Sequence, residues 1–283
     1  MSSVLHPSLG LGPVSLRISD LARSIRFYTE IVGLRILRQQ GRTVELTADG
    51  RHTLVQLHEV EALRPKGRAA GLYHYAILLP DRESLGLALR NLIAHNISVG
   101  QGDHLVSEAL YINDPDGNGI EIYADRPRDT WKRDANGEYV MATDPVDVEG
   151  LLALTDGLEW TGLPEGTVMG HVHFHVSDLA EARRFYCDIL GFEVTAAYGG
   201  AALFVAAGGY HHHVGLNTWA GRGIPNTAPN QAGIEHYTIQ LPSSEEIETV
   251  ISRLRDSGHE AEQRDDAWYV LDPSDIWIRF MTA

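Results

Sequence analysis

DLARSIRFYTEIVGL, residues 20–34, recurs as DLAEARRFYCDILGF at residues 178–192. The Asp-Leu, Phe-Tyr and Gly positions return at a constant offset, and each copy follows a short alternating run that predicts a strand. Each copy itself predicts a helix, with Asp20 or Asp178 as a suitable N-cap and a glycine at the C-terminal end. The chain therefore consists of two related halves.

A second, weaker repeat lies inside each half. GLYHYAILLPD at residues 71–81 and GIEHYTIQLPS at residues 233–243 both precede a helical pattern and further strand-like runs. The sequence therefore predicts four units, each with one strand, one helix and about three more strands. The stretch between the halves is rich in Asp, Gly, Pro and Trp, and it predicts a linker with one short helix near Val148–Leu154. We expect a first domain over residues 1–127, a linker over 128–165 and a second domain over 166–283.

Composition limits the classes of partner. Lys and Arg total 23 against 38 Asp and Glu, and the resulting charge of −15 repels nucleic acid and anionic membranes. The apolar runs fall short of the roughly 18 residues that a membrane span needs. The single cysteine, Cys187, excludes an internal disulfide and fits the reducing cytoplasm. We therefore expect a cytoplasmic protein without nucleic-acid or membrane partners.

The pattern D-L-x-x-[SA]-x-x-F-Y in the repeat and the segment DPDGNGIE at residues 114–121 resemble the vicinal-oxygen-chelate superfamily. This family includes glyoxalase I, fosfomycin-resistance proteins and extradiol dioxygenases, and the resemblance covers nearly the whole chain apart from the linker. It implies an α+β fold of four βαβββ modules in two glyoxalase-like domains with cupped sheets. In that family a divalent metal sits in a cup formed by two modules. A shared fold does not decide the chemistry.

Alignment of the four units on their first strands brings histidines to one position. Counted seven residues before each expected helix cap, that position holds Pro13, His74, His171 and His236. Near the end of unit two stands Glu121, where unit four has Arg279. Units two and three therefore offer His74, His171 and Glu121. These are the two imidazoles and one carboxylate of the facial triad of non-heme Fe(II) oxygenases. Units one and four cannot form such a triad, so we expect one metal per chain, held between the two halves.

Residues 102–121, GDHLVSEALYINDPDGNGIE, resemble the extradiol ring-cleavage signature. That signature is Gly-x-His, five residues, an aliphatic residue, Tyr, two residues, Asp-Pro-x-Gly and finally Glu. The resemblance implies that Tyr111 and His104 hydrogen-bond the substrate oxygens and steer ring opening. The nearby turn sequence alone would be weak evidence, since it is common in loops.

A run of three histidines follows Gly208-Gly209-Tyr210. Extradiol enzymes carry a His-His pair whose second member is an acid–base group, and alignment on Gly215 makes His212 that residue. His211 and His213 stay open as alternatives, because the register depends on one glycine. Neighbours on a strand point to opposite faces, so we expect His212 to face away from His211 and His213. By the same alternation, His173 and His175 should share the face of His171.

The resemblance as a whole implies an extradiol dioxygenase. It would cleave catechol or a substituted catechol with O2 to a 2-hydroxymuconic semialdehyde-type product, using Fe(II) or alternatively Mn(II). Imidazole titrates in the range that suits His212 to take and return a catechol proton. Relatives are often homo-oligomeric, so a homo-oligomer is expected. In larger extradiol enzymes the triad lies on units three and four, and here it would bridge the halves.

Two other functions on the same fold remain open from the sequence. A glyoxalase- or epimerase-like enzyme with Ni, Zn or Co would use the triad but would leave Tyr111, His104 and His212 without a task. A metal-free protein that sequesters an antibiotic would explain the fold but has no need for His74, His171 and Glu121 together.

Overall fold

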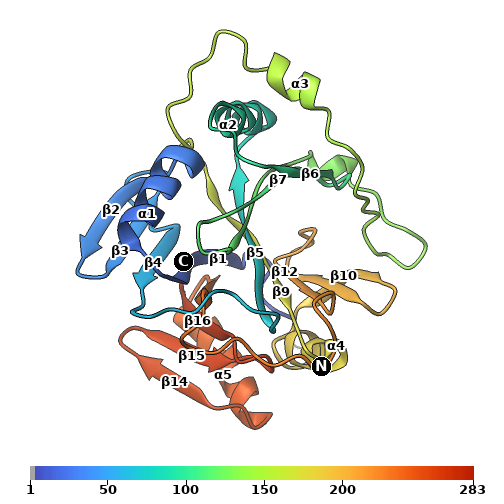
Figure 1. The fold of residues 1–283 in the computed structure, drawn as a ribbon. Coiled ribbons are helices and arrows are strands. Elements are labelled where there is room, and N and C mark those ends of the chain that lie inside the picture. The colour runs from blue at the N-terminus through green and yellow to red at the C-terminus, as the bar shows by residue number, and fades with distance from the viewer. Residues whose placement is uncertain (1–3) are drawn as a thin grey trace.

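Two eight-stranded mixed sheets form the framework of residues 4–283, which the computed structural model describes (Figure 1). The expected α+β fold of four βαβββ units is confirmed. One sheet has the order β14-β15-β16-β13-β1-β4-β3-β2, and the other has the order β10-β11-β12-β9-β5-β8-β7-β6. Each sheet therefore combines one unit from the first half of the chain with one unit from the second half.

The first sheet is made by units one and four. Unit one contains β1 (Gly10–Ile18), α1 (Leu21–Arg26), a π-helical turn (Phe27–Val32), β2 (Arg35–Gln40), β3 (Thr43–Thr47) and β4 (Val55–Glu59). Unit four contains β13 (Gly233–Leu241), α5 (Ser244–Asp256), β14 (Ala261–Arg264), β15 (Ala267–Leu271) and β16 (Trp277–Thr282). The two units join where β1 runs antiparallel to β13.

The second sheet is made by units two and three. Unit two contains β5 (Gly71–Leu79), α2 (Arg82–Ala94), β6 (Gly100–Asp103), β7 (Ser107–Asn113) and β8 (Gly119–Asp125). Unit three contains β9 (Val168–His175), α4 (Leu179–Arg183), a π-helical turn (Arg184–Ile189), β10 (Glu193–Tyr198), β11 (Ala202–Ala206) and β12 (Val214–Asn217). Antiparallel pairing of β5 with β9 joins these units. Between the halves lie a 3-10 turn (Arg128–Thr130) and α3 (Val148–Ala153), which packs against α2.

The repeated segments form helices with the caps that their sequence predicts. Asp20 accepts a hydrogen bond from the backbone N–H of Arg23, and Asp178 caps the start of α4 in the same way. Gly33 and Gly191 follow the π-helical turns with φ angles of 91° and 95°, a left-handed conformation that glycine adopts without steric cost.

Two buried polar networks repeat with the units. In one, Tyr75 donates to the hydroxyl of Tyr28, and Tyr28 donates to the carboxylate of Asp114 over 3.2 Å. In the other, three equivalent residues repeat the arrangement, since Tyr237 donates to Tyr186 and Tyr186 donates to Asp272. Each network ties the helix of one unit to a first strand and a β-turn of another unit. Buried hydroxyl and carboxyl groups satisfied in this way add specificity to the packing around them.

A single apolar cluster runs through both sheets and the helices that cover them. Contacts of β1 with β9 and of β13 with β5 join the two sheets. Within residues 4–283, no helix is both long and apolar enough to span a membrane.

Candidate metal centre and its pocket

One row of residues across the second sheet organises the site. His171 on β9 pairs with Ala76 on β5, Ala76 pairs with Glu121 on β8, and Glu121 pairs with Tyr111 on β7. Directly paired residues point to the same face of a sheet, and their Cβ atoms lie roughly 5 Å apart. His74 lies two residues before Ala76 and so shares this face. The ten-residue spacing between Tyr111 and Glu121 is therefore the register of the β7–β8 hairpin.

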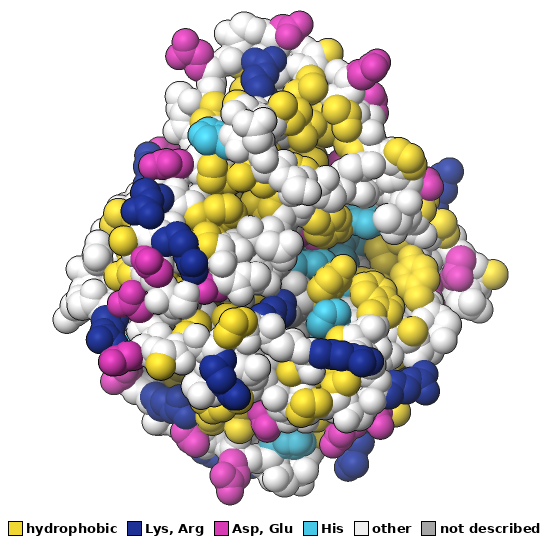
Figure 2. Space-filling view, in the orientation of Figure 1, with side chains coloured by type: hydrophobic (Ala, Val, Ile, Leu, Met, Phe, Trp, Pro, Cys, Tyr) yellow, Lys and Arg dark blue, Asp and Glu magenta, His cyan; other side chains and the backbone are white. Residues whose placement is uncertain are grey.

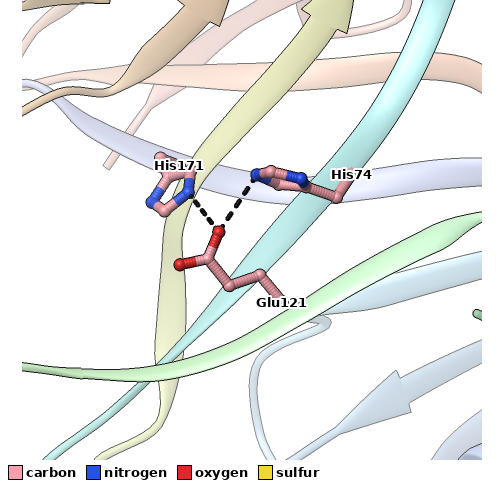
Figure 3. A group of neighbouring side chains, drawn as sticks. All are labelled: His74, Glu121 and His171. Atoms are coloured by element: carbon pink, nitrogen blue, oxygen red, sulfur yellow. Dashed lines mark hydrogen bonds and ion pairs between the residues drawn. The ribbon is translucent and has the colours of Figure 1, made fainter. Parts of the chain in front are cut away.

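Three side chains converge on one point in this row (Figure 3). The Nε2 atoms of His74 and His171 each lie 3.0 Å from Oε2 of Glu121. All three side chains are buried. Among the described residues, His74, Glu121 and His171 are the one set of potential ligands whose donor atoms lie within 4.8 Å of one another.

The hydrogen bonding of the triad fits a cation. His171 donates a hydrogen bond to Glu121, but the contact from His74 lacks hydrogen-bond alignment. Both ring nitrogens of His74 and Nδ1 of His171 are consequently buried without a hydrogen-bond partner among residues 4–283. Buried polar atoms are rarely left unsatisfied, and such exceptions often mark a bound ion. The donor set, two neutral nitrogens and one carboxylate, suits a divalent transition metal.

Electrostatics favour the ligating forms of His74 and Glu121. Burial lowers the pKa of His74, although Glu121 opposes that shift. Burial disfavours the charge on Glu121, but the two imidazoles outweigh it and hold the pKa of this carboxyl well below its usual range. At neutral pH the site therefore offers a neutral imidazole at His74 and a carboxylate at Glu121, which are the forms that bind a metal.

Tyr111 and His104 form a hydrogen-bonded pair beside the triad. The Tyr111 hydroxyl lies 2.6 Å from Nε2 of His104, and Nδ1 of His104 lies 2.7 Å from the carbonyl oxygen of Ala142. Because a carbonyl only accepts, Nδ1 carries the proton, and Nε2 of the neutral ring accepts from Tyr111. Burial, followed by the charge of Glu121, raises the pKa of Tyr111 well above its ordinary value. Tyr111 is therefore a protonated phenol at the edge of the site.

His212 also reaches the site, with its ring centre 4.1 Å from that of His171. The prediction that His211 and His212 face opposite ways is wrong, because Nδ1 of one lies 2.8 Å from Nδ1 of the other. These residues belong to the loop before β12 rather than to a strand, so strand alternation does not apply. His213 turns elsewhere, toward Phe192 and Tyr210. Of the three histidines, His212 is the one that lines the pocket.

His173 and His171 share one face of β9, as the alternation predicts, and both line the pocket. The amide of Asn217 lies between His173 and His175, at 2.9 Å and 2.7 Å from their ring nitrogens. Gly215 leaves room for His173, since a Cβ at this position would lie 2.8 Å from its ring. The glycine that aligns the histidine run therefore has a packing role of its own.

The triad opens into a cavity of about 700 Å³, visible as a hollow where histidine and hydrophobic side chains gather (Figure 2). Its walls include five large apolar or aromatic side chains that sequence reasoning did not single out: Tyr73, Met141, Tyr198, Phe204 and Trp219. Met141 comes from the segment between the halves, so the predicted linker forms part of the wall. Within the described residues, no lysine or arginine lines this cavity.

The equivalent cup of units one and four has no such centre. Its aligned positions hold Pro13, His236 and Arg279. Burial lowers the pKa of His236 to about 4, and the positive charge of Arg279 adds to that effect. A guanidinium has no lone pair to offer a cation and repels one.

Proteins of known description resemble this chain along nearly its whole length. The Glyoxalase/Bleomycin resistance protein/Dioxygenase superfamily matches it twice, over residues 10–122 and 168–280. Catechol-2,3-dioxygenase of Bacillus subtilis (strain 168) is 50% identical over 98% of this chain and 99% of its own length. An iron-dependent extradiol dioxygenase of Rhodococcus jostii (strain RHA1) is 27% identical over 40% of this chain and 42% of its own. The structure of glyoxalase I from Zea mays, 15% identical, superposes with a TM-score of 0.58 over 97% of this chain and 92% of that one, which shows a shared fold alone.

Proposed function

The chain belongs to the Glyoxalase/Bleomycin resistance protein/Dioxygenase superfamily, and we propose that it is an extradiol dioxygenase that opens a catechol ring with O2. The product is a 2-hydroxymuconic semialdehyde-type compound. Full-length likeness to a catechol-2,3-dioxygenase supports this function. Enzymes of this kind depend on a metal, and His74, His171 and Glu121 are the residues that would hold it.

The single observation that carries the proposal is the set of polar side chains that face the same cavity as the triad. A glyoxalase-type enzyme would need the three ligands alone. Here the hydrogen-bonded pair Tyr111–His104 and the imidazole of His212 face the same cavity. A phenol and an imidazole beside ligands that suit a redox-active metal are groups that can hydrogen-bond a catechol and accept its proton.

A divalent iron or manganese ion at this triad would supply coordination for the catechol oxygens and a route for electrons from catechol to O2. We propose Fe(II), with Mn(II) as the alternative, because the triad resembles that of non-heme Fe(II) oxygenases and one relative is described as iron-dependent. Metal analysis of the purified protein tests this choice.

The side chains around the triad have separate roles in proton transfer and in hydrogen bonding to the substrate. His212 accepts a proton from a catechol hydroxyl and returns it when the ring opens. Burial, followed by the neighbouring imidazoles, lowers the pKa of His212 well below its ordinary value, so the ring enters the reaction as a neutral imidazole with one free lone pair. The Tyr111 hydroxyl, whose proton is donated to His104, accepts a hydrogen bond from a catechol hydroxyl through its oxygen, and His104 holds the phenol in place.

The cavity favours catechols with an apolar substituent. Its volume is within the range of sites for drug-sized ligands and far exceeds a single ring. Met141, Phe204 and Trp219 supply apolar or aromatic contact surface, whereas the described lining residues include no lysine or arginine to pair with a carboxylate. Burial of an unpaired carboxylate is unfavourable by several kcal/mol.

Steady-state kinetics with O2 consumption test both parts of the proposal. Catechol should give a yellow ring-fission product with one O2 consumed per ring, and a colourless cis,cis-muconate would show intradiol chemistry instead. We expect kcat/KM for 4-tert-butylcatechol to equal or exceed that for catechol, and kcat/KM for 3,4-dihydroxybenzoate to be at least about tenfold lower. Preference for the carboxylated substrate would refute the apolar-pocket argument while leaving ring cleavage intact.

The remaining proposals concern organisation. We propose that residues 1–127 and 166–283 are the two domains, joined by residues 128–165. We also propose a cytoplasmic homo-oligomer, since a reducing compartment suits the unpaired Cys187 and relatives are often homo-oligomeric. Size-exclusion chromatography with light scattering tests the oligomer.

A further inference from the structure

We propose that Asp125 and His211 are positioning residues that hold His212 with its proton on Nδ1 and the lone pair of Nε2 in the pocket. This inference goes beyond the proposed function but rests on its assignment of His212 as the acid–base group. Asp125 and His211 do not line the cavity themselves. They act on the reaction only through the ring that does.

The three side chains form a continuous chain of short contacts. Oδ1 of Asp125 lies 2.9 Å from Nε2 of His211, and Nδ1 of His211 lies 2.8 Å from Nδ1 of His212. The side chain of His211 is fully buried, and that of Asp125 is 22% exposed. The chain thus runs from the end of β8, near solvent, into the site.

Proton counting along this chain decides the tautomer of each ring. An ionised carboxylate only accepts hydrogen bonds, so Nε2 of His211 carries a proton and donates it to Asp125. In the neutral ring Nδ1 of His211 is then an acceptor, and the partner nitrogen of His212 must donate to it. His212 is left with its lone pair on Nε2, the nitrogen not used in this contact. A base needs that lone pair to take a proton from a substrate.

Surrounding side chains hold the hydrogen-bonded series Asp125–His211–His212 in place. Tyr210 donates to Asp125 over 3.3 Å, and its hydroxyl lies 2.7 Å from that of Tyr123. The indole ring of Trp131, from the segment between the halves, packs with its centre 5.2 Å from that of His211. Thr195 donates to the backbone carbonyl of His211 over 2.6 Å. These contacts limit rotation of His211, so His212 is presented to the pocket in one orientation.

An oriented base matters because a ring with the wrong tautomer cannot accept the proton. Carboxylate partners of catalytic histidines act in this way in hydrolases, where they hold the imidazole in the correct tautomer. Outer partners of metal-site groups are typically worth about 10–100-fold in activity. The chain Asp125–His211–His212 should have an effect of that size.

Two substitutions of His211 separate hydrogen bonding from packing. His211→Phe keeps the ring volume but removes both nitrogens. His211→Asn leaves a cavity but places an acceptor oxygen near the former Nδ1, where His212 can still donate to it. We expect kcat to fall about 10–100-fold in His211→Phe and less in His211→Asn, whereas Tm should fall more in His211→Asn.

Metal content and the anaerobic dissociation constant for catechol should be unchanged in both His211 variants. His213→Asn is the matched control, because His213 is buried beside them but turns away from the pocket and accepts a hydrogen bond from the backbone N–H of Ala207. Its kcat should equal that of the wild type. Full kcat in His211→Phe, a slower His211→Asn than His211→Phe, or loss of metal in either variant would overturn the proposal.

Nitrogen-15 NMR of histidine-labelled, metal-free full-length protein reads the tautomer without any turnover. His212 should show a protonated Nδ1 and an unprotonated Nε2. In Asp125→Asn the amide can donate to His211 and reverse its tautomer, so His212 should shift toward the Nε2-protonated form and kcat should fall. A proton on Nε2 of His212 in the wild type overturns the proposal. If the protein fails to cleave catechol while the tautomer is as expected, the proposed function fails and the positioning stands.

Discussion

At the scale of single residues, the small residues around the site explain its geometry as much as the ligands do. Ala76 stands between His171 and Glu121 in the central row, and its small side chain leaves the space in which the ligands meet. Gly102 of the Gly-x-His motif makes room for His104, since a Cβ there would lie 3.0 Å from that ring. The Gly-x-His motif therefore needs its glycine because the ring of His104 packs directly against the backbone at residue 102.

Replacement of His212 by alanine should leave the metal bound and abolish most turnover. The ring packs against His171 but is not among the three converging ligands. We expect a loss of about 10²–10⁴-fold in kcat, the usual contribution of a positioned acid or base. Metal content per chain and oxygen consumption are measured on the same preparation. Loss of the metal would identify His212 as a ligand instead.

Tyr111→Phe should bind metal normally but open the ring slowly or release uncoupled product. The substitution removes the hydroxyl that lies 2.6 Å from His104, while it keeps the aromatic ring that lines the cavity. The ratio of ring-fission product to O2 consumed is the measurement, and His104→Gln tests the other member of the pair. Wild-type rate and coupling in Tyr111→Phe would show that Tyr111 serves packing alone.

At the scale of elements, the two Tyr–Tyr–Asp networks explain why the Asp-Pro part of the ring-cleavage motif also occurs in unit four, which contributes no residue to the candidate metal centre. Asp114 and Asp272 each accept backbone N–H groups of their own β-turn and a tyrosine hydroxyl from the helix of another unit. The Asp-Pro pair is therefore a structural device that holds units together. The carboxylate that follows in unit two, Glu121, is the part that distinguishes the candidate metal centre.

Asp272 should make the stability of the protein depend on pH. Burial raises its pKa to about 6, whereas an unfolded aspartate titrates near about 3.9. The folded state therefore holds the proton more tightly. The stability contributed is fully present below about pH 4 and is lost as the pH rises through about 6, with a total on the order of 2–3 kcal/mol.

Asp272→Asn removes this titration. The Tm of the wild type minus that of the variant should therefore decrease between pH 4 and pH 7. Asp256→Asn, at the exposed end of α5, is the control and should show no such trend. Parallel curves for the wild type and Asp272→Asn would mean that the carboxyl is ionised throughout.

At the scale of the whole molecule, the halves of the chain are interleaved. Antiparallel pairing of β5 with β9 and of β1 with β13 places one unit of each half in each sheet. The candidate metal centre consequently draws His74 and Glu121 from the first half and His171 from the second. The segment between the halves contributes Met141 to the cavity and Trp131 to the packing around His211.

This arrangement predicts opposite outcomes for two aligned histidines. His171→Ala should lose most of its metal, because two remaining ligands hold a divalent ion poorly. His236→Ala, at the same position of β13, should keep both metal and activity, with some loss of stability. Metal per chain is measured after desalting. If His236→Ala strips the metal instead, the centre lies in the sheet of units one and four.

The sequence by itself determines the local elements and their repetition. Caps such as Asp20 and Asp178, strand alternation and the offset between the halves are short-range signals, so they predict four units and the histidine positions within them. Comparison of the units also shows that Glu121 of unit two can bind a metal whereas Arg279, at the aligned position of unit four, cannot, because a carboxylate has lone pairs to offer and a guanidinium has none.

Only the tertiary structure decides which groups act together. Asp125 lies four residues after Glu121 on β8, an even spacing that could have drawn attention to it, but its partner His211 is 86 residues away. The loop that turns His211 toward His212 breaks strand alternation, and the apolar wall of Phe204 and Trp219 comes from strand and loop positions that carry no motif. Such contacts depend on long-range register and on the packing of side chains, for which a local pattern carries no signal.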